Sequence, residues 1–131
     1  VTNNLTITSG KLDASAANCN SNTTSCNITV ANTWLTYTGG LFEAQTGTVT
    51  FNGTTTGKEI TTAGSDFYHL AITGNGGYWT LQDPLYVSGN LSMSNGTLDS
   101  GSKDVYVGGM WRNYTSGKFI ANTSTVSFND G

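Results

Sequence analysis

Residues 85–93 read LYVSGNLSM, and residues 105–111 read VYVGGMW. When the two segments are superimposed, apolar residues share the first, third and seventh positions, and a glycine shares the fifth. Side chains alternate across an extended backbone, so this period of two indicates a strand with one buried face. The shared glycine indicates a bend that a Cβ would obstruct. The segments start 20 residues apart, a spacing typical of successive turns of a solenoid.

The same alternation recurs through the chain, at steps of 21, 21, 15, 20 and 21 residues, from starts at Ile28, Val49, Leu70, Leu85, Val105 and Val126. Equivalent strands of successive turns would stack in parallel and bury together the apolar side that a single turn leaves exposed. We therefore expect an all-β fold, a parallel β-solenoid of about six turns of ~20 residues each. An antiparallel β-sandwich is the alternative, because regularly spaced turn signals suit it as well.

A longer repeat overlies the short one. Residues 28–52 match residues 105–129 at an offset of 77, and residues 4–13 match residues 90–99 at an offset of 86. The difference of nine residues lies in an inserted loop at 14–27. We interpret the 131-residue chain as one solenoid domain, in which a four-turn module occurs about one and a half times.

Aromatic residues follow the same alternation. It directs Trp34, Trp79 and Trp111 inward, so we expect them in the core. Tyr86 and Tyr106 should instead face outward as neighbours in successive turns. Exposed rings in this arrangement are candidates for a surface ladder or for stacking on sugar rings.

The composition narrows the possible functions. Hydrophobic residues make up 36% of the chain and charged residues 10%, with a net charge of −3. Disordered chains of low apolar content usually carry a higher net charge, so persistent alternation favours a thin-cored β architecture. Five Lys plus Arg argue against nucleic acid or an anionic membrane as a partner. No apolar run approaches the ~20 residues of a membrane span, and the lack of a signal peptide suggests a processed or excised chain.

Cys19 and Cys26 bracket the polar part of the inserted loop. A disulfide between them would fix that loop and indicates an oxidising, extracytosolic compartment. A metal pair is the alternative, but two further Cys or His ligands are lacking, and we expect no metal or cofactor.

Eight N-x-S/T acceptor sequences suggest N-glycosylation. Most of these asparagines adjoin an inward residue or lie in a turn, where a bulky glycan is accommodated. The alternative is that asparagine serves as a polar strand and turn residue and forms ladders along the stack. The candidates are Asn4, Asn22, Asn27, Asn52, Asn90, Asn95, Asn113 and Asn122.

The acidic residues and the single histidine give little indication of catalysis. Asp83 and Asp104 are expected at neighbouring corners, where β-helical enzymes that cleave polysaccharides bring carboxylates together. Aspartate is also an ordinary turn residue, so we expect no enzyme. His69 is expected simply at the surface.

Segments such as LYVSGNLSMSNGTLDSG, VYVGGMWRN and GTVTFNG resemble the repeats of secreted bacterial and archaeal surface proteins with a parallel β-helix of filamentous-haemagglutinin-like architecture. The resemblance covers nearly the whole chain and concerns repeat style. It implies an extracellular fibrous, adhesive or cell-envelope role and transfers no catalytic or binding residues.

The first and last turns suggest self-assembly. Solenoid ends expose unpaired backbone groups unless a cap covers them, and neither end of this sequence reads as a cap. We expect head-to-tail stacking between copies through Val1, Leu5, Val126 and Phe128, a contact that gives an open filament. The expected function is therefore a glycosylated extracellular filament or stalk. A glycan-binding adhesin and a polysaccharide-cleaving enzyme are the alternatives.

Overall fold

The computed structural model describes residues 3–15, 17 and 26–129. These residues contain no α-helix. Their strands are β1 (Leu5–Ile7), β2 (Gly10–Asp13), β3 (Ile28–Val30), β4 (Trp34–Thr36), β5 (Gly40–Glu43), β6 (Thr48–Phe51), β7 (Lys58–Thr61), β8 (His69–Ile72), β9 (Tyr78–Leu81), β10 (Leu85–Val87), β11 (Leu91–Asp99), β12 (Val105–Val107), β13 (Trp111–Ile120) and β14 (Val126–Phe128).

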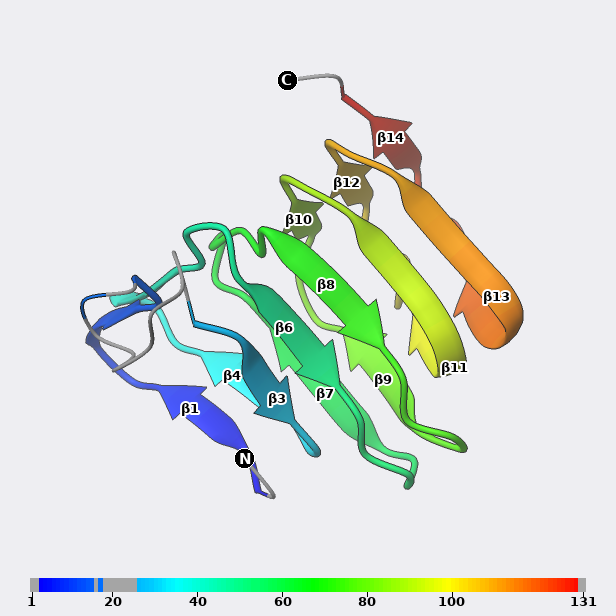
Figure 1. The fold of residues 1–131 in the computed structure, drawn as a ribbon, viewed down its shortest axis with the longest axis horizontal. Coiled ribbons are helices and arrows are strands. Elements are labelled where there is room, and N and C mark those ends of the chain that lie inside the picture. The colour runs from blue at the N-terminus through cyan, green and yellow to red at the C-terminus, as the bar shows by residue number, and fades with distance from the viewer. Residues whose placement is uncertain (1–2, 16, 18–25, 130–131) are drawn as a thin grey trace.

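The strands wind into a parallel β-solenoid whose turns pass through three faces (Figure 1). The first face stacks β3, β6, β8 and the starts of β11 and β13. The second stacks β1, β4, β7, β9 and the ends of β11 and β13. The third carries β2 with β5, and β10 with β12 and β14. All of these pairings are parallel, which confirms the predicted fold class.

The register corrects one step of the predicted repeat. Leu70 pairs with Leu91, whereas Leu85 pairs with Val105 on the third face. Leu85 therefore belongs to the same turn as Leu70, and the step of 15 residues between them is a move from one face to another. The first face holds five levels, so the solenoid has about five turns: Ile28, Val49, Leu70, Leu91 and Trp111.

The 77-residue repeat in the sequence does not relate equivalent positions in space. Ile28 lies on the first face and Val105 on the third. Trp34 likewise lies on the second face and is fully buried, while Trp111 lies on the first and is only partly buried. The prediction of a core position is thus confirmed for Trp34. Trp111 packs against the core but is only partly buried, because no strand of the described residues stacks over β13.

The core is a narrow column of apolar side chains in which aromatic rings meet edge to face. The Trp34 ring centroid lies 4.8 Å from that of Phe42 and 5.0 Å from that of Phe67. Trp79 is fully buried, as predicted, and lies 5.6 Å from Phe51. Such pairs add about 0.5–1.5 kcal/mol each beyond the burial of their surface. Aromatic rings therefore help to fill a core that composition alone would leave thin.

The shared glycine of the two defining segments is explained by close approach between turns. A Cβ on Gly89 would lie 2.6 Å from His69 Nδ1, and one on Gly109 would lie 2.5 Å from Asn90 Oδ1. Each glycine therefore leaves room for the corner side chain of the turn below. The predicted bend without a Cβ is confirmed at both positions.

One cation is buried in this core. Lys58 is 3% exposed, donates a hydrogen bond from Nζ to the Thr55 carbonyl, and places Nζ 4.6 Å from the centroid of the Trp79 ring. Burial lowers the pKa of the Lys58 ammonium below its usual 10.5. The charge is thus held by one carbonyl and one ring face, without a carboxylate partner among the ion pairs of the described residues.

We predict that Lys58→Met raises the free energy of unfolding at pH 7 by about 1 kcal/mol, because a buried charge gives way to an apolar side chain of similar length. The gain should shrink as the pH rises toward 10.5. Wild-type unfolding takes up a proton where the folded pKa is depressed, so the wild type gains stability with pH in that window. Urea unfolding of both proteins from pH 7 to 10.5 measures this difference, and a constant difference would contradict the account.

Candidate functional site

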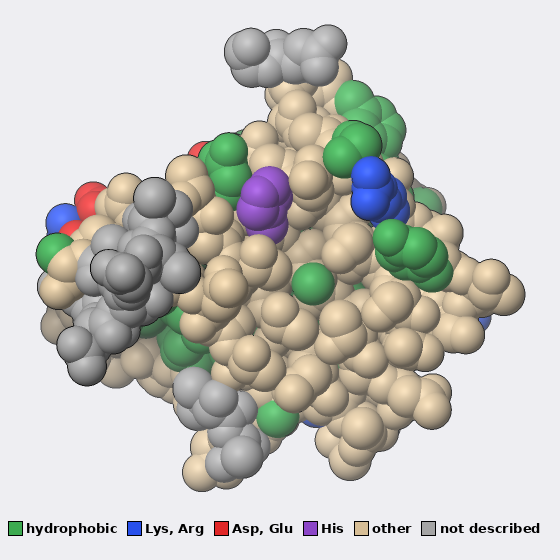
Figure 2. All heavy atoms as spheres, viewed as in Figure 1, with side chains coloured by type: hydrophobic (Ala, Val, Ile, Leu, Met, Phe, Trp, Pro, Cys, Tyr) green, Lys and Arg blue, Asp and Glu red, His purple; other side chains and the backbone are tan. Residues whose placement is uncertain are grey.

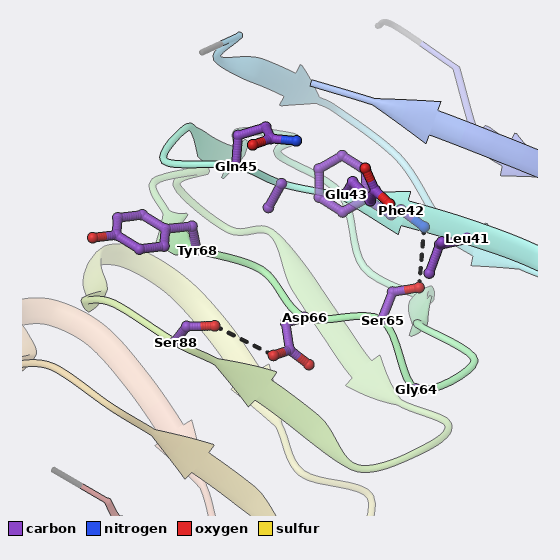
Figure 3. Close-up of a pocket in the computed structure, with 10 residues that line it drawn as sticks. Leu41, Phe42, Glu43, Gln45, Gly64, Ser65, Asp66, Tyr68 and Ser88 are labelled. Carbon is purple, nitrogen blue, oxygen red and sulfur yellow. Dashed lines mark hydrogen bonds between the residues drawn. The ribbon is translucent and has the colours of Figure 1, made fainter. Parts of the chain in front are cut away.

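The third face has a break in its sheet. The turn between β5 and β10 contributes no strand there, and Phe67 alone forms a bridge, to Val87. The link to β5 is instead a hydrogen bond from the Phe42 backbone N–H to Ser65 Oγ, 3.1 Å long. This missing strand leaves a hollow of about 400 Å³ on the outer side of the face (Figure 3).

Polar and aromatic side chains line the hollow. Figure 3 shows Glu43 and Gln45 on the side of β5, across from Asp66, Tyr68 and Ser88. Ser88 Oγ donates to Asp66 Oδ2 at 3.3 Å. Two further bonds tie the β5 side to β2: Lys11 Nζ lies 3.0 Å from Glu43 Oε2, and Gln45 Nε2 donates to Asp13 Oδ1 at 3.2 Å. The hollow is thus lined by polar groups that neighbouring turns hold in place.

Two tyrosines form a ladder on the same face. The rings of Tyr86 and Tyr106 stack with centroids 4.8 Å apart and planes 5° apart, as the register of β10 and β12 requires. Tyr86 is 36% exposed. The predicted outward pair in successive turns is therefore confirmed. Because Phe67 pairs with Val87, Asp66 lies one level below Tyr86.

Side chains at the corners accept hydrogen bonds from the backbone of the next turn. Asn27 Oδ1 accepts from the Thr48 N–H at 2.9 Å, and Asn90 Oδ1 accepts from the Met110 N–H at 2.9 Å. His69 Nδ1 accepts from the Asn90 N–H at 2.9 Å. These bonds satisfy backbone donors where the chain bends and the sheet ladder is interrupted. His69 is half-buried, and its side chain is visible at the surface in Figure 2.

Asp83 and Asp104 also accept hydrogen bonds from the backbone, Asp83 from the preceding turn and Asp104 from the next one. Asp83 accepts hydrogen bonds from the backbone of Thr62 and Ala63 at 2.9 and 2.6 Å, and Asp104 accepts one from Thr125 at 2.8 Å. The two carboxylates accept hydrogen bonds from the backbone of two different turns. Within the described ranges no group of three or more His, Cys, Asp or Glu side chains is placed to hold a metal ion.

A third carboxylate, that of Asp99, links two turns through hydrogen bonds. The Tyr78 hydroxyl donates to Asp99, and Asn122 Nδ2 donates to the same carboxylate. The bond from Tyr78 is the main cause that lowers the pKa of Asp99, and the same bond raises the pKa of Tyr78. Asp99 is thereby held ionised as an acceptor between β9 and the loop after β13.

The glycosylation candidates differ in exposure. Asn90 and Asn95 are half-buried, and Asn22 lies outside the described residues. The Nδ2 atom of Asn122 donates to Asp99 and to Ser100 Oγ, whereas Asn27 accepts a hydrogen bond through its Oδ1. The exposed candidates are Asn4, Asn27, Asn52, Asn113 and Asn122.

The remaining predicted residues concern the loop and the ends. Cys19 and Val1 lie outside the described residues, so the disulfide with Cys26 stays a prediction. Leu5 lies in β1 on the second face, whereas Val126 and Phe128 lie in β14 on the third. A stack that keeps the phase of the turns therefore cannot join Leu5 to these two residues. It would place β2 on β14 and β1 on the end of β13.

The last turn leaves apolar side chains open. Phe128 is 62% exposed and Met110 51%. The Trp111 ring is covered only in part, by Phe119 at 4.9 Å and Phe128 at 6.2 Å between centroids. Figure 2 shows hydrophobic side chains gathered toward this end of the molecule, on a surface with few charged groups. The upper side of β13 and β14 is thus an open aromatic surface that is available for stacking.

No family model matches the chain, and no curated protein and no solved structure matches it. Among the described residues no helix is long and apolar enough to cross a membrane. The function proposed below is therefore inferred from the fold and its surfaces.

We predict that Asn90→Ala lowers the free energy of unfolding by about 1 kcal/mol, because the Met110 N–H loses its acceptor. Asn90→Asp should retain most of the stability, since a carboxylate oxygen accepts the same bond. Urea unfolding of unglycosylated protein compares the two variants. Equal losses in both would show that the amide, and not the acceptor at this corner, matters.

Proposed function

We propose that this chain is a structural section of an extracellular filament or stalk, which lengthens when the first turn of a second copy stacks on the last turn of the first. The role is mechanical and non-catalytic. The observation that supports it most is the open upper side of β13 and β14, where Trp111, Phe119 and Phe128 remain partly or largely exposed. The resemblance to repeats of secreted surface proteins points in the same direction.

The backbone of β14 offers a template for a further strand. The Thr125 carbonyl and the Asn129 N–H both bond downward to β12. In a parallel ladder alternate residues bond to opposite neighbours, so the N–H and C=O groups of Val126 and Phe128 point away from β12. An edge of this kind pairs readily with another chain.

The lower end presents the matching elements in the same order. Its first described turn consists of β1 on the second face and β2 on the third, and both carry partly buried leucines, Leu5 and Leu12. Burial of a side chain such as Phe128 in this contact contributes about 1.5–3 kcal/mol. The two ends differ from each other, so the contact is heterologous and repeats into an open filament.

The surface chemistry supports an extracellular setting. Glycans on the exposed acceptor asparagines would point away from the core, and a disulfide between Cys19 and Cys26 would fix the inserted loop where thiols are oxidised. The outer side of the first face carries few charges, as suits a coated fibre. The glycans, the disulfide and the low surface charge are all parts of the proposed extracellular role.

We predict that the 131-residue protein elongates with concentration and that Phe128→Pro abolishes elongation. Proline removes one upward N–H while leaving the downward bonds of β14 intact, and it is tolerated at an edge strand. Light scattering after size exclusion and negative-stain microscopy measure the assembly. Phe128→Thr is the matched control, because it shortens the side chain but keeps the N–H and a strand-forming residue.

Two outcomes would overturn the stacking. A wild-type protein that stays monomeric at millimolar concentration excludes it. A Phe128→Pro variant that elongates as the wild type does excludes pairing through β14, provided that thermal unfolding shows both proteins folded.

We predict that native material is heavier than the 13.7 kDa polypeptide, with glycans on exposed asparagines such as Asn52 and Asn113. Asn122 should be the least occupied of the exposed sites, because its Nδ2 donates to Asp99 and Ser100. Intact mass before and after enzymatic removal of N-glycans, followed by peptide mapping, tests this. A native mass equal to that of the polypeptide would exclude the glycan coat.

A further inference from the structure

The hollow on the third face has the features of a small-molecule binding site, unlike the ends of the solenoid, which are proposed to stack on another copy. Its volume of about 400 Å³ lies within the ~300–1,000 Å³ range of ligand pockets. Buried Phe42 and Ala44 form part of its lining, with exposed fractions of 3% and 8%. Such a floor is apolar, while the rim carries hydroxyl, amide and carboxylate groups. A site of this composition matches a ligand with both C–H surface and hydroxyl groups.

Several rim groups retain unused hydrogen-bonding capacity. Within the described part of the chain, Glu43 Oε1, Asp66 Oδ1 and the Tyr68 hydroxyl have no hydrogen-bond partner. The opposite oxygens of the two carboxylates are fixed by Lys11 and Ser88. The carboxylates are therefore oriented by neighbouring turns and still able to accept a bond from a ligand hydroxyl.

An aromatic surface adjoins the hollow. Tyr106 covers one face of the Tyr86 ring in a nearly parallel stack, so the other face of Tyr86 is directed toward the level of Asp66, one turn below. Tyr68 contributes a second ring to the rim (Figure 3). Rings with an apolar face and a polar hydroxyl suit ligands that are apolar on one side and hydrated on the other.

We propose that this hollow binds a neutral sugar, with hydroxyl groups donating to Asp66 and Glu43 and the C–H surface of the sugar packed against Tyr68 and Tyr86. The negative charge of the rim favours a neutral ligand over an anionic one. Two carboxylates on the rim and a chain net charge of −3 disfavour an anionic ligand. Lys11, a cation beside the rim, is paired with Glu43. The site goes beyond the stacking role, because the third face points outward along the whole solenoid and stays accessible in a filament.

The test uses unglycosylated, ¹⁵N-labelled 131-residue protein titrated with glucose, galactose, mannose or N-acetylglucosamine, and with glucuronate as the anionic counterpart. At least one neutral sugar should shift the amide resonances of Glu43, Ser65, Asp66 and Ser88. Tyr68→Ala and Tyr86→Ala should each weaken that binding about tenfold or more. Tyr114→Ala is the matched control, because Tyr114 is 52% exposed but lies in β13, away from the third face.

The outcomes separate this proposal from its rivals and from the stacking proposal. It is overturned if no neutral sugar shifts these amides, if glucuronate binds as tightly as the neutral sugar that binds best, or if Tyr114→Ala weakens binding as much as Tyr68→Ala. It is also overturned if the hollow responds to Ca²⁺ alone. Repeating the titration on Phe128→Pro isolates the site from assembly, since that variant should bind sugar unchanged.

Discussion

Parallel stacking of equivalent side chains between turns is the interaction on which the rest of this structure depends. No single turn has enough apolar surface to form a core, so each turn is stable only when the next one buries it. The column from Val49 through Leu70 to Leu91 shows the principle, since each residue lies over the like residue of the turn below. The corners, the hollow and the open end are consequences of how faithfully each turn repeats the one beneath it.

The corners satisfy the backbone where the ladders are interrupted. Short polar side chains such as Asn27, Asn90 and Asp104 accept the N–H of the next turn, and glycines leave room for them. This explains why a chain rich in Asn, Ser, Thr and Gly forms a single ordered fold. The same residues read equally well as glycosylation acceptors or as turn formers, because both functions need a short polar side chain at the surface.

Alternation in the sequence was enough to predict the parallel stack and the contact between Tyr86 and Tyr106. It was insufficient to assign faces, since an inward residue reads alike on all three. Leu85 therefore reads as the start of a new turn after Leu70, although it lies on the third face of the same turn. Trp111 has the inward phase of Leu91 but is only partly buried, because no strand of the described residues stacks over β13. The hollow was missed altogether. Its one sequence signal is the lapse of alternation in TAGSDFY at residues 62–68, where a strand is replaced by a turn and a single bridge.

The register between turns can be measured most directly by disulfide trapping in a Cys19→Ser, Cys26→Ser background. Ala71 and Ser92 pair across the first face, and paired positions of neighbouring strands lie within the ~4.4–6.8 Å Cα separation that a disulfide spans. The account predicts that Ala71→Cys with Ser92→Cys oxidises to an intramolecular disulfide under mild conditions, seen as the loss of two hydrogens by mass. Ala71→Cys with Tyr86→Cys, which the 15-residue step would bring together, should stay reduced. Cross-linking of the second pair, and not the first, would contradict the three-faced solenoid.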